Sequence, residues 1–397
     1  MTTAIPASAP RPATRREWLG LVVLMLPTVL LALDMTVLHL AAPHLSADLQ
    51  PTSAQLLWIL DIYGFMIAGF LVTMGTLGDR IGRRRLLLAG ATAFGLASVL
   101  AAFADTAEAL IAGRALLGIA GATLMPSTLS LLRNMFQVDA QRTLAITVWM
   151  TGFIVGSAMG PLIGGLMLEF FWWGSVFLLG VPVMLLLLAV GPWLLPEFRD
   201  DNAGRLDILS ALLSVAMVLM VIYGLKDMAR NGASLMALGA VLLGGALGVI
   251  FVRRQRRLVQ PMFDMALFHN RAFSTSVGAM MLTILAMSGA WLMVFQYLQG
   301  VLGLSPLRAG IVMLPATLVQ VFGSLLVPVL AGRMPKSVLI SGGLLLAALG
   351  FVAMAQVTGH DTMAWLLVGT VIMGFGVMPM MILGTDCLLY TSDAADE

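Results

Sequence analysis

Three ionisable side chains interrupt long apolar stretches of the sequence: Asp34, Asp61 and Arg114. A charged group at the centre of a bilayer costs about 2.5–3.5 kcal/mol on insertion scales, so such residues are by default functional. Burial raises the pKa of a carboxylic acid and a nearby guanidinium lowers it, so a carboxylate under both influences can load and unload a proton. We therefore expect the three residues to meet in a proton-titrating site that attracts cations. An ion pair that only fixes helix packing is the alternative.

The apolar stretches have the length of membrane-spanning helices. Of 397 residues, 60% are hydrophobic and 11% are charged, whereas soluble domains carry about 25% charged residues. The hydrophobic residues gather in runs of about 20, enough to cross ~30 Å of hydrocarbon as a helix. We therefore predict an all-α integral membrane protein with twelve spans, at about 18–42, 56–77, 86–104, 108–132, 143–168, 172–195, 206–226, 234–252, 273–299, 308–332, 337–357 and 363–385.

Lysine and arginine are distributed unevenly between the loops that join these spans. Alternate loops hold 18 of them and the opposite loops hold 3, with Arg114 left inside a span. Because cytoplasmic loops carry the excess of positive residues, the amino terminus is expected in the cytoplasm, with residues 1–17 as a tail. In this orientation Asp34, Asp61 and Arg114 all lie in the outer half of the membrane.

The segment 75–88 separates the second and third spans and has an unusual composition. It combines small residues, an acid and four arginines within a few positions. A loop that only reversed the chain would not need this combination, which suits a packed helix–helix contact that can open and close. The segment, with Gly75, Asp79, Arg80, Gly82 and Arg83 at this spacing, therefore indicates a membrane protein that moves.

The fifth span carries glycine at every fourth position, together with a proline. Four glycines in this register form one smooth helix face, which allows another helix to approach closely. A proline inside the helix removes a backbone donor and favours a kink. We expect this span to pack closely and move through Gly152, Gly156, Gly160, Pro161, Gly164 and Gly165.

Enzymatic and metal-binding motifs are absent from the sequence. There is no His-Glu-x-x-His, Gly-x-Ser-x-Gly or Walker sequence, no cluster of cysteine and histidine, and only one cysteine, Cys387. Two lysines leave little room for a phosphate-binding ATPase loop. We therefore expect neither an enzyme nor a metal or cofactor site, and no nucleic-acid partner. Any energy for movement must come from an ion gradient or a separate subunit.

These motifs together resemble the major facilitator superfamily. The pattern is closest to its 14-span drug–proton antiporter family 2, which includes exporters of quaternary ammonium compounds and methyl viologen. Residues 33–43 look like that family's first-span motif, 75–88 like the gate motif, 114–118 like the fourth-span motif and 156–165 like the antiporter motif. The last of these is associated with exporters more than with uptake symporters.

The resemblance implies roles for the charged residues. Asp34 would couple transport to protons, with Asp61 as a possible second acceptor, and Arg114 would tune that proton. Asp79 and its neighbouring arginines would form charge and helix-cap contacts that hold the outward-facing state. The implied function is proton-coupled multidrug efflux by alternating access. The partners would be lipophilic cations, protons and membrane lipid, and the protein would be a monomer in the bacterial inner membrane.

The resemblance also implies two six-span bundles. A weak echo of the gate segment at 330–343 indicates that the second bundle begins at the ninth span. Only four of its six spans would then be present, and the abruptly polar end of the chain resembles non-native sequence. The expected organisation is a tail at 1–17, a six-helix bundle at 18–195, an inserted helix pair at 206–252, a partial second bundle at 273–385 and a non-native tail at 386–397.

Two other functions fit the same motifs. A facilitator-type symporter for an organic nutrient would share the fold and the gate, and proton flux in the opposite direction would identify it. A membrane fragment that transports nothing would show no substrate-dependent proton movement.

Overall fold

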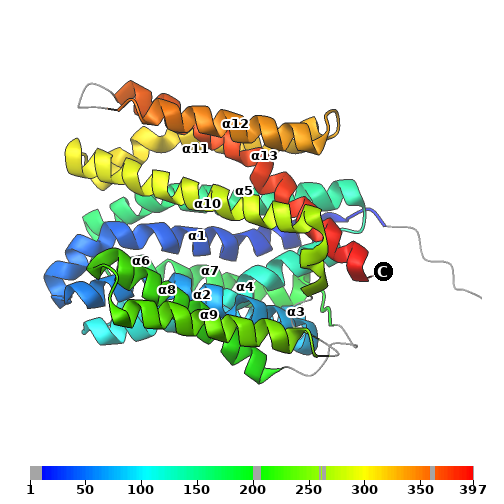
Figure 1. Ribbon diagram of the computed structural model, residues 1–397, viewed down its shortest axis with the longest axis horizontal. Coiled ribbons are helices and arrows are strands. Elements are labelled where there is room, and N and C mark those ends of the chain that lie inside the picture. Colours follow the sequence, from blue (N-terminus) through cyan, green and yellow to red (C-terminus); the bar gives the residue numbers. More distant parts are fainter. Residues whose placement is uncertain (1–10, 200–206, 259–260, 262–264, 358–362, 397) are drawn as a thin grey trace, which may run out of the picture.

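Every element of the described chain is helical (Figure 1). The computed structural model describes residues 11–199, 207–258, 261, 265–357 and 363–396; some helical side chains, among them those of Pro161 and 388–396, lie outside the description. The elements are α1 (Arg15–Leu49), α2 (Ser53–Ile81), α3 (Arg83–Ala102), α4 (Ala107–Met135), α5 (Asp139–Phe170), α6 (Ser175–Leu178), α7 (Gly180–Leu194), α8 (Ile208–Asn231), α9 (Leu235–Gln255), the 3-10 helix η1 (Met265–His269), α10 (Arg271–Gln296), the π-helical turn η2 (Tyr297–Val301), α11 (Pro306–Ala331), α12 (Lys336–Met354) and α13 (Met363–Asp396).

The number of membrane-spanning helices agrees with the sequence. Within the described residues, eleven helical segments are long and apolar enough to cross a membrane, and α6 and α7 together form one of them. The bent helix α5 adds the twelfth, its segments Asp139–Ser157 and Leu162–Phe170 meeting at 42°. The prediction of an all-α membrane protein with about twelve spans is therefore confirmed.

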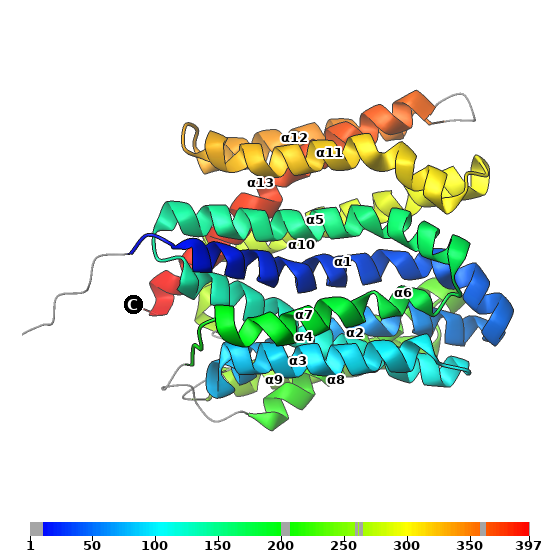
Figure 2. The same cartoon turned by 180° about the vertical axis from the view of Figure 1, so that it is seen from behind.

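The helices lie roughly alongside one another in two groups. In both views α1–α7 occupy one side of the bundle and α10–α13 the other, with α5 near the boundary (Figures 1 and 2). Helix α5 packs on α1 within its own group and on α11 across the boundary. Helices α8 and α9 pack on each other, and α8 packs on α2, at the edge away from α12.

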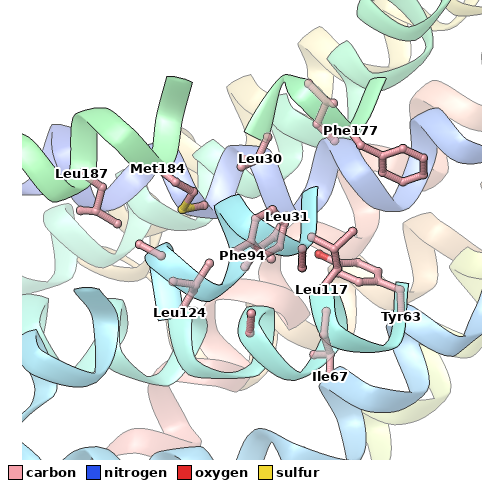
Figure 3. Close-up of a cluster of buried hydrophobic side chains, with 14 of the residues drawn as sticks. Leu30, Leu31, Tyr63, Ile67, Phe94, Leu117, Leu124, Phe177, Met184 and Leu187 are labelled. Atoms are coloured by element: carbon pink, nitrogen blue, oxygen red, sulfur yellow. The ribbon is translucent and has the colours of Figure 1, made fainter. Parts of the chain in front are cut away.

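The first group has its own continuous core. Its buried side chains come from every helix from α1 to α7, and Figure 3 shows part of this cluster, with Tyr63 and Phe177 at one end. Phe94, Leu31 and Leu117 are each at most 2% exposed. Two smaller clusters lie among α10–α13. Lipid tails are as apolar as these side chains, so close van der Waals packing rather than escape from water holds the helices together.

Small residues set the spacing between α1 and α5. A Cβ atom added at Gly152 would lie 3.1 Å from Met25, one at Gly156 only 2.3 Å from the backbone oxygen of Val29, and one at Gly160 against Thr36. These glycines therefore lie on the α1 face of α5. Gly164 is buried, and Gly165 faces α11, where an added Cβ atom would lie 3.4 Å from Cβ of Leu307.

The closest of these contacts with backbone gives a stability prediction. Gly156→Ala should lower the thermal unfolding midpoint of the detergent-solubilised protein, because the new methyl group meets backbone that cannot rotate away, and overpacking costs about 1–3 kcal/mol. Gly245→Ala on α9 is the control, because nothing lies within 4 Å of its added Cβ. That control should be neutral or slightly stabilising, since alanine favours helix over glycine by about 1 kcal/mol. Equal midpoints for the two variants would contradict the predicted close contact.

Candidate functional site

Asp34 of α1 and Arg114 of α4 form a buried ion pair. Nη1 of Arg114 donates to Oδ2 of Asp34 at 2.6 Å, and the side chains are 1% exposed for Arg114 and 11% for Asp34. Nε of Arg114 donates to the backbone oxygen of Ile59 on α2 at 3.3 Å. The guanidinium thus joins three helices through one charged group.

Aromatic rings surround the arginine on its other sides. Its Cζ lies 4.5 Å from the ring centroid of Tyr63 and 5.8 Å from that of Phe177. A cation over an aromatic face is stabilised by the ring quadrupole, by about 2 kcal/mol or more where water is excluded. The buried hydroxyl of Tyr63 has no hydrogen-bond partner among the described residues.

A glycine one turn after the arginine explains how α4 comes so close to α2. A Cβ atom at Gly118 would lie 2.5 Å from the backbone oxygen of Tyr63 and 2.6 Å from Cβ of Met66. Residues four apart share a helix face, so Gly118 lies on the same side of α4 as Arg114. The glycine removes the side chain that would otherwise hold the guanidinium away from Ile59.

Asp61 does not share this contact, and the expectation that all three charges meet is corrected. Its carboxylate pairs with Lys226 of α8, whose Nζ lies 5.0 Å from the ring centroid of Phe65. The reason is helical phase. Ile59 faces α4, and two residues along α2 turn the side chain by about 200°, so Asp61 points toward the inserted pair.

Lys226 is one of the three positive residues assigned from the sequence to the loops opposite the cytoplasmic ones, and its role was missed. The structure places it inside α8, where it holds that helix to α2. The rings of Trp58 and Tyr223 reinforce the contact, with centroids 6.3 Å apart and planes inclined by 19°. The available signal was an acid a short distance after the start of one helix and a base a short distance before the end of another.

The residues of segment 75–88 gather where α2 ends and α3 begins. Asp79 and Arg83 form an ion pair one helical turn apart. Gly82 joins the two helices with φ at 108°, and a Cβ there would lie 2.4 Å from Oε1 of Glu197. Glycine is therefore required twice, for its backbone conformation and for the space. Gly75 lines a cavity of about 330 Å³ between α2 and α4, as do Asp79 and Arg83, whereas Arg80 is exposed.

Glu197 completes this region and was not singled out from the sequence. Its Oε1 accepts a hydrogen bond from the backbone N–H of Arg84 at 3.0 Å, and Phe198 O accepts one from Arg83 N at 2.9 Å. Its Oε2 lies 3.5 Å from Nε of Arg84 and 3.8 Å from that of Arg85. The first N–H groups of a helix lack internal partners, so this acid caps α3 from the end of α7. The feature of the sequence that could have indicated this role is an acid directly after the sixth predicted span.

The two helix groups touch through α5 and α11. The hydroxyls of Thr151 and Ser324 lie 2.8 Å apart across this boundary. Gly165 packs against Leu307 several turns away along the same pair of helices. The expected packing role of the Pro161 side chain lies outside the described residues. Among the described residues, no group of three or more His, Cys, Asp or Glu is arranged to hold a metal ion.

Known proteins share this sequence over most of its length. Residues 24–394 match the family model described as Major Facilitator Superfamily. The chain is 44% identical over 380 residues to the multidrug efflux pump LfrA of Mycolicibacterium smegmatis, covering 96% of this chain and 75% of LfrA. It is 38% identical over 381 residues to the methyl viologen resistance protein SmvA of Salmonella typhimurium, covering 96% of this chain and 77% of SmvA.

Solved structures share the fold at low sequence identity. A crystal structure of the peptide transporter POT in complex with sulfate matches with a TM-score of 0.61 at 16% identity, over 94% of this chain and 84% of that one. A mutant of the same transporter matches with a TM-score of 0.64 at 18% identity. The matched family is one of transporters and not of enzymes, and this chain, a multi-pass helical membrane protein, belongs to the major facilitator superfamily.

Proposed function

We propose that the protein is a proton-coupled multidrug antiporter that exports lipophilic, quaternary-ammonium-type cations by alternating access. The buried Asp34–Arg114 pair is the observation that carries this proposal. The names of two relatives, a multidrug efflux pump and a methyl viologen resistance protein, support the substrate class. The excess of Lys and Arg in alternate loops supports an amino terminus in the cytoplasm of a bacterial cell.

The pair is held in place whether Asp34 is ionised or protonated. With Asp34 ionised, the carboxylate neutralises Arg114 and attracts cations. With Asp34 protonated, the guanidinium keeps its bond to Ile59 O and its contact with the Tyr63 and Phe177 rings. Asp34 is the more exposed partner, and arginine stays charged at any accessible pH. The proton therefore moves on and off Asp34, and its arrival cancels the attraction that holds a cationic substrate.

The two helix groups supply the movement. We assign residues 18–195 and 273–385 to two bundles that rock against each other about the α5–α11 contact, with 206–252 as an inserted pair. The region where α2 meets α3 closes the cytoplasmic side in the outward-facing state. Its ion pair Asp79–Arg83 and the Glu197 cap on α3 are contacts that can form and break as a unit.

Asp34→Asn should abolish proton-coupled export and leave membrane insertion intact. The asparagine oxygen still accepts a hydrogen bond from Arg114, but the side chain no longer titrates. The measurement is ethidium efflux from cells, with proton release followed by a pH-sensitive dye in everted vesicles. Asp139→Asn is the matched control, because its side chain is 88% exposed at the start of α5. Unchanged ethidium efflux in Asp34→Asn would refute the proposal, and proton flux in the opposite direction would indicate a symporter.

The single variant Arg114→Gln should be less stable than the double variant that also carries Asp34→Asn. Removing one partner of a buried pair leaves an uncompensated charge and costs about 3–5 kcal/mol, whereas the double variant leaves two neutral amides. Thermal unfolding in detergent measures both effects, and neither variant should export ethidium. A double variant less stable than the single one would show that the pair is not the stabilising contact.

Glu197→Gln should weaken closure at the α2–α3 junction. The amide still caps α3 but loses its charge against Arg84 and Arg85. The measurement is the labelling rate of a cysteine introduced at Thr76, which lines the 330 Å³ cavity, by a membrane-impermeant maleimide in a Cys387→Ser background. We expect faster labelling than with Glu169→Gln, a change at an exposed acid next to the last residue of α5. Identical rates would exclude Glu197 from closure.

A further inference from the structure

A second and larger cavity lies between α2 and the inserted pair. Its volume is about 660 Å³, and α2, α8 and α9 form its walls, with η1 at one end. Its lining is mainly apolar, from Val72 of α2 to Met217 of α8 and Phe251 of α9. Cavities of about 300–1,000 Å³ are the size that holds small molecules. None of the residues placed in the transport site lines it.

Small residues create this space. Ala68 and Gly69 of α2 and Gly248 of α9 line it, and a Cβ atom at Gly248 would lie 3.2 Å from Sδ of Met217. Three membrane helices therefore enclose a gap that larger side chains would close. An empty gap loses the dispersion contacts of its lining, so within a bilayer a hydrocarbon chain is the natural filling.

The cavity has the depth of one leaflet. It extends along α9 from Arg256, just past the end of that helix, to Gly248 eight residues earlier. Eight residues of α-helix rise about 12 Å. Half of the ~30 Å hydrocarbon core is about 15 Å. A single acyl chain that enters at Arg256 therefore reaches nearly to the bilayer midplane.

Positive charge lies at the mouth of the cavity, and no acid of the described part of the chain lines it. Arg256 and His269 line that end, and both are exposed. Arg254 is already engaged, because its Nε and Nη2 donate to Asp207 at 2.8 and 3.0 Å and hold the pKa of that carboxyl at about 2. Arg256 forms no ion pair among the described residues. This charge repels a lipophilic cation and suits an anionic head group.

We propose that this cavity is a binding site for an anionic phospholipid. One acyl chain fills the space between α2, α8 and α9, and the phosphate head group lies against Arg256 and His269. The site is separate from the Asp34–Arg114 pair, and its occupant is a membrane component rather than a transported substrate. Because α2 forms one wall and also carries the Asp79–Arg83 ion pair, a bound lipid would hold the inserted pair against that helix.

Lipid retention measured by native mass spectrometry tests the site. The purified protein is incubated with phosphatidylglycerol or phosphatidylcholine of identical chains, and the lipid-bound fraction is recorded. Wild type should retain phosphatidylglycerol about fivefold better, since a surface arginine contributes about 1 kcal/mol toward an anionic lipid. Arg256→Gln should remove this preference. Ala68→Phe should reduce retention of both lipids by filling the cavity.

Matched controls decide between this site and general surface charge. Arg253→Gln removes the same charge from an exposed position of α9 that does not line the cavity, and Ala246→Phe adds the same ring to an exposed position of that helix. Both should behave as wild type. The proposal is overturned if wild type retains the two lipids equally, if Ala68→Phe retains them like Ala246→Phe, or if Arg253→Gln matches Arg256→Gln. Displacement of phosphatidylglycerol by tetraphenylphosphonium from wild type would identify a cation site instead and also overturn it.

Discussion

The membrane interior cannot solvate a charge, and the arrangement of the first helix group follows from the need to neutralise Arg114. An unpaired guanidinium there would cost several kcal/mol. The structure offsets this cost with the carboxylate of Asp34, the carbonyl of Ile59 and the faces of two rings. These partners come from α1, α2 and α6, so those three helices and α4, which carries Arg114, must converge at one depth. Gly118 permits this approach, because any side chain at that position would strike the backbone of Tyr63.

Close approach between helices is the second constraint, and glycine controls it throughout. The glycines of α5 let α1 pack closely on it, and α5 also contacts α11. The boundary helix α5 is therefore attached firmly to its own group. Between α8 and α9, a Cβ at Gly224 or Gly244 would lie 2.7 Å from the opposing helix, which makes the inserted pair a tight unit. That unit is joined to α2 by Lys226 near one end and leaves a gap near the other.

Helix α2 connects the buried ion pair, the inserted pair, the larger cavity and the α2–α3 junction. Its first half supplies Ile59 to the buried arginine and Asp61 to the inserted pair. Its middle lines the larger cavity, and its last turns carry Asp79 and the turn at Gly82. A continuous helix transmits displacement along its axis, because its backbone hydrogen bonds resist local compression. A change in the contacts of Asp34 and Arg114 therefore acts on the same rigid element as the contacts at the α2–α3 junction.

The sequence by itself determined the fold class, the approximate spans and the presence of charges within them, because hydrophobic length and the cost of buried charge are properties of one segment at a time. It also indicated the glycine face of α5, which depends on helical period alone. Only the tertiary structure decided which charges meet. It paired Asp34 with Arg114, turned Asp61 toward Lys226 and brought Glu197 to the start of α3. The physical reason is that partners on different helices depend on rotation and depth of each helix against its neighbours, and a linear pattern carries neither.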